Sequence, residues 1–255
     1  MNIEDIEDLR DSQKELEKVY DYRLIPRMWT IFRLDGRCFS SLTRSIHSKM
    51  PFSKSFQECM VNVTKSMIQE FRPDLTFVGS DEISLIFDSV YEFDYRLEKY
   101  LSLLSSFASV EFYKEVLKYK DLSDIASKTP HFDCRVVQCS LNDVIDYITV
   151  RKAEVVRNAE RTLLRHFMSH NKLQGHSNAW GFRELKKTNP EQLNYFNEHP
   201  EYLGSFICYK DTEVNLTQEE LNKIPEKYRP DGPVIRKVPT EISESEVVQY
   251  LKEKE

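Results

Sequence analysis

The spacing of apolar side chains predicts a strand and a helix in the first third of the chain. Residues 28–34 are rich in aromatic and β-branched side chains and predict a strand, which ends at Asp35 and Gly36. After Ser53, apolar residues recur at spacings of three and four, as on one face of a helix. Ser53 is a preferred capping residue, and Pro73 ends the pattern. We therefore expect a helix between these two residues.

A β-hairpin is expected next. Apolar runs at 75–78 and 83–87 flank the polar segment 79–82, which predicts two strands joined by a tight turn. The same patterns predict helices over 4–20, 94–118 and 142–169, a strand over 131–139, and a short amphipathic helix near 241–252 in an otherwise irregular segment, 171–255.

The order of these elements, β-α-β-β-α-β, indicates an α+β fold. It is typical of a ferredoxin-like antiparallel sheet backed by helices. We expect residues 1–140 to form this sheet together with its N-terminal lead-in. Residues 141–255 would supply the long helix and a mostly helical or irregular C-terminal extension that completes the same compact unit.

Composition and charge narrow the class of protein. Apolar residues make up 40% and charged residues 31% of the 255 residues, as in ordinary soluble proteins. There is no run of about 18 apolar residues that could span a membrane, and the acidic N-terminus lacks the apolar segment of a secretory signal. The five cysteines are irregularly spaced, which argues against a disulfide framework. We expect a cytoplasmic protein without membrane association.

Acidic side chains stand at the ends of the predicted strands. Asp35 ends one strand, and Asp81 and Glu82 occupy the turn of the hairpin. If these strands are neighbours, the acids emerge at one edge and repel each other unless a cation lies between them. Mg²⁺ is usually held by one or two carboxylates with substrate phosphates, and a pair of such ions promotes phosphoryl transfer. The alternative interpretation is that these acids merely end their strands.

The two residues after Asp35 fit the same chemistry. Gly36 lacks a Cβ, so we expect it to permit a sharp exit from the strand and a close approach of the backbone to a ligand. Arg37 offers a planar guanidinium that can bind a phosphate through two hydrogen bonds. Together they favour a phosphate ligand beside the acids.

Several motifs occur in the same order as in a known enzyme family. They are Leu34-Asp35-Gly36-Arg37 with Phe39, Ser80-Asp81-Glu82 with Ile83-Ser84-Leu85, Phe132-Asp133 with Arg135-Val136, and Asp146-Tyr147 with Arg151. In these motifs the chain resembles the tRNA-histidine guanylyltransferase superfamily. Arg157-Asn158 and the segment 173–177 are more similar to its bacterial-type, guanylyltransferase-like branch. The resemblance covers roughly residues 20–210.

The resemblance implies a polymerase-palm-like catalytic domain that extends RNA in the 3′-to-5′ direction. ATP or GTP would activate the 5′ end of a tRNA or tRNA-like RNA, and the 3′-hydroxyl of an incoming nucleoside triphosphate would then attack that end. The branch that the chain resembles repairs truncated 5′ ends against a template. A homo-oligomer, specifically a tetramer, is also implied by the resemblance.

The resemblance further assigns roles to individual residues. Two Mg²⁺ ions would be held by the Asp35 carboxylate, the Gly36 carbonyl and the Asp81 carboxylate, and the catalytic acids would be Asp35, Asp81 and Glu82. The nucleotide and its triphosphate would contact the loop after the first strand, the hairpin turn and two lysines, namely Asp35, Gly36, Arg37, Cys38, Phe39, Ser40, Lys49, Ser80, Asp81 and Lys99.

The chain departs from the family pattern at two places. The family usually has a lysine directly before the proline of the loop after the first strand, but Met50 stands there, with Lys49 one residue earlier. On the long helix the guanylyltransferases carry a His-Ile-Asn-Asn-Leu-Tyr-Asn motif. Only Asn158 remains of it, and Val156 replaces the histidine. That motif is associated with selecting histidine tRNA, so its loss favours the repair branch.

The long helix also carries a basic face. Arg157, Arg161 and Arg165 recur every four residues and therefore share one side of it. Residues 151–187 contain nine Lys or Arg and only three Glu, in a chain whose net charge is −6. Such a stretch could follow an RNA backbone, although a solvated helix face is the alternative. We expect RNA contacts from Arg151, Arg157, Asn158, Arg161 and Arg165.

Three other functions stay open at this point. One is addition of a single G to histidine tRNA, which Val156 disfavours. Another is a nucleotidyl cyclase, since palm domains with two metal-binding acids also make cyclic nucleotides. The third is a non-catalytic RNA-binding palm, against which the presence of Asp35, Gly36 and Asp81 argues.

Overall fold

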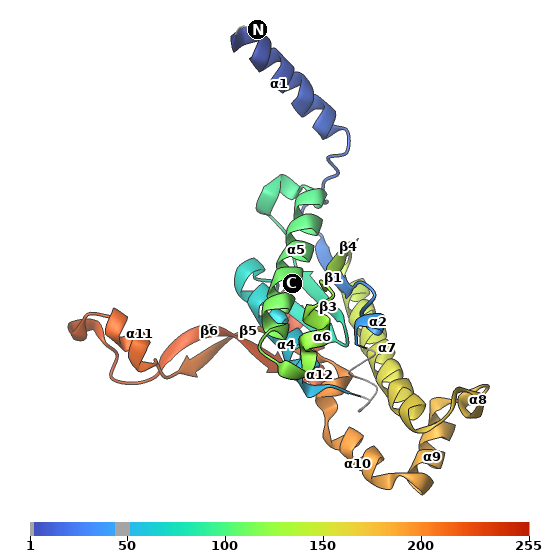
Figure 1. Cartoon of the computed structure of the whole chain (residues 1–255). Helices are drawn as coiled ribbons and strands as arrows, with labels where there is room; N and C mark the ends of the chain where they lie inside the picture. The colour runs from blue at the N-terminus through green and yellow to red at the C-terminus, as the bar shows by residue number, and fades with distance from the viewer. Residues whose placement is uncertain (1–2, 44–51, 255) are drawn as a thin grey trace.

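An antiparallel sheet organises the fold. The computed structural model describes residues 3–43 and 52–254, and in these residues the sheet has six strands in the order β4-β1-β3-β2-β5-β6 (Figure 1). The strands are β1 (Trp29–Gly36), β2 (Leu75–Gly79), β3 (Glu82–Phe87), β4 (Phe132–Cys139), β5 (Ser205–Val214) and β6 (Val234–Ile242). The first four strands follow the ferredoxin-like order, which confirms the predicted fold class.

The long helices begin and end where the sequence supplies caps. Ser53 caps α4 by accepting a hydrogen bond from the Phe56 backbone nitrogen at 3.2 Å, and the helix ends at a left-handed Arg72 before Pro73. Ser140 caps α7 in a capping box with Asp143. The helices are α1 (Ile3–Lys18), α2 (Phe39–Leu42), α4 (Lys54–Phe71), α5 (Leu97–Val116), α6 (Ser123–Ala126), α7 (Leu141–Phe167), α8 (His170–Leu173), α9 (Asn178–Thr188), α10 (Pro190–Glu198), α11 (Gln218–Lys223) and α12 (Glu244–Lys252).

Helices cover both faces of the sheet. On one face of the sheet, side chains of β1 and β3 pack against α4 and α5 and form the largest apolar core. Phe32, Leu34 and Leu85 belong to this core. The opposite face, which includes Ile31 and Ile86, packs against α7 and α12. Residues that alternate along one strand therefore enter different cores, as the period of a strand requires. The described helices include none that is long and apolar enough to cross a membrane.

The C-terminal region differs from the expectation of irregular structure. Strand β5 pairs with β2, and β6 pairs with β5, so the region extends the sheet by two strands. Their far ends, with α11, project from the rest of the molecule, as α1 also does (Figure 1). Only Phe206, Ile207 and Cys208 of β5 are buried, and β6 contains Pro239. Proline is tolerated there because β6 is an edge strand.

Candidate active site

Strands β1 and β3 bring the predicted acids to one edge of the sheet. Asp35 stands directly opposite Glu82 in the register of the two strands. The backbone nitrogen of Gly36 donates a hydrogen bond to the carbonyl of Asp81 at 3.0 Å. The expectation that these strands are neighbours is therefore confirmed, and Asp35 and Asp81 lie at the same corner of the sheet.

The turn that carries Asp81 is short and locally strained. Ser80 and Asp81 join β2 to β3, and Ser80 takes a left-handed conformation with φ of 55°. Its hydroxyl donates a hydrogen bond to Oδ1 of Asp81 at 3.0 Å. A left-handed residue other than glycine costs free energy, and such residues often mark functional sites. The turn thus holds the Asp81 carboxylate at the end of the hairpin.

The environment of Asp81 disfavours its negative charge. Burial raises the pKa of its carboxyl above the ordinary value of 3.8, and the charge of Asp35 adds to the rise, while the hydrogen bond from Ser80 opposes it. A bound cation would offset this cost. The electrostatic environment of Asp35 and Asp81 therefore favours binding of a cation.

This shift predicts a pH dependence of stability in the metal-free protein. Because folding raises the pKa of Asp81, the folded state binds more protons than the unfolded state between 3.8 and the folded pKa. The free energy of unfolding should therefore fall as pH rises through that window. For the Asp81→Asn variant this free energy should fall less. Urea unfolding of both proteins in chelator, over a pH series, measures the difference. Parallel curves for the two proteins would refute the shift.

The donor set suits a hard divalent ion. Asp35 and Asp81 offer carboxylate oxygens, and Nη2 of Arg135 is 3.9 Å from Oδ2 of Asp35. Within the described ranges, no group of three or more His, Cys, Asp or Glu side chains gathers into a metal cage. Asp35 and Asp81 are the residues that could hold a divalent ion here, since Mg²⁺ is usually held by one or two carboxylates together with substrate phosphates and water.

Glu82 occupies a different position from the one expected of a catalytic acid. Its side chain is buried and accepts two hydrogen bonds from Arg151 of α7, one of them from Nε at 2.7 Å. Nε of Arg33 lies 3.8 Å from the same carboxylate. Burial raises the pKa of Glu82, and the bonds from Arg151 act against that rise. Both carboxylate oxygens are thus engaged by protein side chains.

The loop after β1 is fixed by an aromatic anchor. Phe39 is buried, and its ring centroid lies 5.1 Å from those of both Phe112 and Phe132. Its side chain therefore belongs to the core rather than to a nucleotide-binding surface. Arg37, Cys38 and Ser40 are exposed along the same loop.

The sequence analysis predicted two nucleotide-binding lysines, of which the structure describes one, Lys99. Lys49 and Met50 lie outside the described residues. Lys99 lies in the first turn of α5. The part of α5 that lies beside the acids is marked by Ser109, whose hydroxyl accepts a hydrogen bond from the backbone nitrogen of Phe132, the residue paired with Gly36. Ten residues of helix, about 15 Å, separate the two positions. Within one chain, Lys99 therefore lies away from Asp35 and Asp81.

The predicted RNA-facing residues of α7 differ in their exposure and partners. Arg157, Asn158 and Arg165 are exposed, while Nη2 of Arg161 donates to the carbonyl of Leu173 at 3.3 Å. Arg151 differs, because its guanidinium turns inward onto Glu82 and is only 20% exposed. Asn158 and Ser80 line one small cavity of about 90 Å³, so the exposed part of α7 adjoins the hairpin turn.

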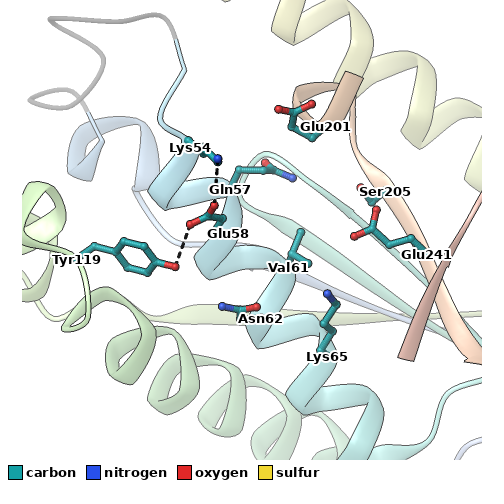
Figure 2. Close-up of a pocket in the computed structure, with 10 residues that line it drawn as sticks. All are labelled: Lys54, Gln57, Glu58, Val61, Asn62, Lys65, Tyr119, Glu201, Ser205 and Glu241. Atoms are coloured by element: carbon teal, nitrogen blue, oxygen red, sulfur yellow. Dashed lines mark hydrogen bonds and ion pairs between the residues drawn. The ribbon is translucent and has the colours of Figure 1, made fainter. Parts of the chain in front are cut away.

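A larger pocket, of about 360 Å³, opens between α4 and the strands β5 and β6 (Figure 2). The Tyr119 hydroxyl donates a hydrogen bond to Glu58 at 3.1 Å, and Lys54 is 3.8 Å from the same carboxylate. The side-chain nitrogen of Gln57 is buried without a partner among the described residues. None of the predicted site residues that the structure describes lines this pocket, so it is separate from the acids.

Known proteins are similar to this chain in sequence. An uncharacterised protein of Acanthamoeba polyphaga mimivirus is 29% identical over 194 residues, which are 66% of each chain. A probable tRNA(His) guanylyltransferase of Drosophila melanogaster is 28% identical over 138 residues, which are 53% of this chain and 48% of that protein. The aligned part therefore spans only about half of the fly protein and just under two thirds of the viral one.

Solved structures agree on the architecture. A bacterial tRNA(His) guanylyltransferase-like protein, solved in complex with ATP, superimposes with a TM-score of 0.67 at 23% identity, over 78% of this chain and 88% of that one. A sequence model of the tRNA(His) guanylyltransferase family matches residues 10–140. These residues are just over half of the chain and contain β1 to β4 and both acids. The chain therefore belongs to the tRNA(His) guanylyltransferase family.

Proposed function

We propose that this protein is a magnesium-dependent nucleotidyltransferase that adds nucleotides to the 5′ end of tRNA or a tRNA-like RNA. Addition runs in the 3′-to-5′ direction, follows a template and comes after activation of the 5′ end by ATP or GTP. The observation that carries the proposal is the junction of Asp35, Gly36 and Asp81, which the bond from Gly36 to the Asp81 carbonyl holds together at 3.0 Å.

Asp35, the Gly36 carbonyl and Asp81 are the groups that would hold two Mg²⁺ ions. When bound, such ions lower the pKa of an attacking hydroxyl and offset the charge of a leaving pyrophosphate. Asp35 is half-exposed, so its carboxylate is open to a ligand that arrives from solvent. Arg37, Cys38 and Ser40 would orient the triphosphate, because they are exposed in the segment that follows Asp35. Ser80 keeps the Asp81 carboxylate in place.

The exposed face of α7 would bind the RNA. Arg157 and Arg165 are exposed to solvent, with the Arg157 guanidinium 4.0 Å from Glu154, and Asn158 adjoins the turn that carries Asp81. Contacts of this kind supply affinity for the phosphate backbone rather than a choice of sequence. The bases of the RNA itself would then choose the incoming nucleotide. A cytoplasmic location and assembly as a tetramer are further parts of this proposal.

One assay tests the function. The protein is incubated with Mg²⁺, each labelled nucleoside triphosphate in turn, and a 5′-truncated tRNA. Two RNA variants differ only in the nucleotide opposite the missing position. The nucleotide added should change with that opposing nucleotide, because base pairing selects it.

Other outcomes would overturn the proposal in distinct ways. Addition of G whatever the opposing base would indicate the histidine-tRNA activity after which the fly protein is named. A cyclic nucleotide formed without RNA would indicate a cyclase. RNA binding without turnover would leave only a binding module.

A further inference from the structure

Three successive turns of α7 contact the hairpin that carries Asp81. Tyr147, Arg151 and Val155 are spaced by four residues, so they lie on one face of the helix. The hydroxyl of Tyr147 is 2.9 Å from that of Ser84 in β3. One turn later, Arg151 holds Glu82. This row of contacts runs along β3 toward the turn.

The third contact lies on the other side of the turn. Gly79 is the last residue of β2, and a Cβ placed on it would stand 2.7 Å from Cγ2 of Val155. Helix α7 therefore touches the hairpin at Gly79 and at Glu82, immediately before and after Ser80 and Asp81. A turn fixed on both sides has little freedom to shift its carboxylate.

The contact with Arg151 has the geometry of a rigid support. Its guanidinium donates to both oxygens of Glu82, and the Glu82 side chain is only 8% exposed. A further nitrogen of the guanidinium binds Glu154, one turn along the same helix. Two parallel hydrogen bonds to a carboxylate define direction as well as distance. Because Glu82 and Glu154 together engage all three guanidinium nitrogens of Arg151, this side chain cannot bind an RNA phosphate at the same time.

We propose that Arg151 is a positioning residue of the metal site: through Glu82 it sets the place of Asp81, and it does not bind RNA. This inference rests on the proposed function, since it takes Asp35 and Asp81 to be the metal ligands. Partners of this kind, which orient a ligand without touching the metal, typically change metal affinity by about 10–100-fold when they are removed.

The test measures metal affinity and RNA affinity separately. Mn²⁺ is the probe, and its binding to the full-length protein without RNA is followed by electron paramagnetic resonance. Arg151→Met should weaken Mn²⁺ binding about tenfold or more. Its dissociation constant for a 5′-truncated tRNA, measured in chelator at fixed salt, should stay unchanged.

A matched control separates positioning from loss of stability. Lys118 pairs with Glu115, a glutamate side chain that is also only 8% exposed but that belongs to α5 rather than to the hairpin or α7. Lys118→Met therefore removes the cationic partner of an equally buried carboxylate, which keeps its hydrogen bond from Asn62 at 3.0 Å, and should leave Mn²⁺ affinity unchanged. The double variant Glu82→Gln/Arg151→Met removes both charges of the pair, so it should fold more stably than Arg151→Met. Its Mn²⁺ affinity should nevertheless remain weak.

The outcomes distinguish failure of this inference from failure of the proposed function. If Asp81→Asn leaves Mn²⁺ binding intact, the metal site itself is wrong. If Asp81→Asn abolishes binding while Arg151→Met has no effect, only the positioning role is wrong. Recovery of wild-type affinity in the double variant would make Arg151 a merely structural residue. If Arg151→Met weakened tRNA binding and left Mn²⁺ binding normal, Arg151 would be an RNA-binding residue and not a positioning residue.

Discussion

Replacing Asp81 with asparagine is expected to lower the rate of nucleotide addition by about 10³-fold or more, which corresponds to about 4 kcal/mol of lost transition-state stabilisation. The carboxamide has nearly the same shape but only a neutral oxygen to offer a cation. Initial rates of template-directed addition to a 5′-truncated tRNA, over a series of Mg²⁺ concentrations, measure the effect. Saturating Mg²⁺ should restore little, because the missing charge belongs to the protein.

This loss should be separable from unfolding. Burial and the nearby Asp35 disfavour a charged Asp81, so the neutral variant should be at least as stable as the wild type in metal-free buffer near neutral pH. Asp211→Asn is a suitable control, because that acid is exposed on β5 and should leave the rate unchanged. An Asp81→Asn variant that retained more than about a tenth of the wild-type rate would contradict the assigned role.

Replacing Gly36 with alanine is expected to reduce both stability and activity. A Cβ at this position would lie 2.5–2.7 Å from three atoms of the Phe39 ring, which is closer than such atoms can approach. Phe39 cannot easily retreat, because Phe56, Phe112 and Phe132 surround it. Overpacking of this kind costs about 1–3 kcal/mol. If the loop moved by about 1 Å instead, activity would fall by about 100-fold.

Urea unfolding and the addition assay together measure this prediction. Gly232→Ala is the matched control, since a Cβ there would meet no atom within 4 Å, and it should leave stability nearly unchanged. The double variant Gly36→Ala/Phe39→Leu should recover part of the lost activity, because the smaller side chain makes room. If Gly36→Ala behaved like Gly232→Ala, the steric account of this glycine would be wrong.

Gly36 also shows why a correct motif can have a different physical basis from the expected one. Gly36 was expected to permit a sharp exit from the strand and a close approach of the backbone to a ligand, but the left-handed residue after β1 is Cys38, with φ of 60°. Gly36 remains within β1, and the Phe39 ring occupies the space where its side chain would be. A contact three residues away in sequence is invisible to a pattern of polarity, so only the packed structure reveals it.

The C-terminal strands show a limit of a different kind. Periodicity identified β1 to β4 because their apolar residues form runs or alternate over most of each strand. In β5 only three residues are buried, and the others are half-buried or exposed. A strand that is held mainly by pairing with its neighbours, rather than by burial of one face, leaves little trace in the pattern.

By itself, the sequence determined the order of strands and helices along the first 170 residues or so of the chain, and the acids at the ends of β1 and of the hairpin. These features are local, because side-chain periodicity and caps act over a few residues. Only the tertiary structure decided which of the charged groups act together. It joined Asp81 to Gly36 and buried Glu82 against Arg151, 69 residues away in sequence. Ion pairs over such separations depend on how a helix docks on a sheet, and no local pattern encodes that.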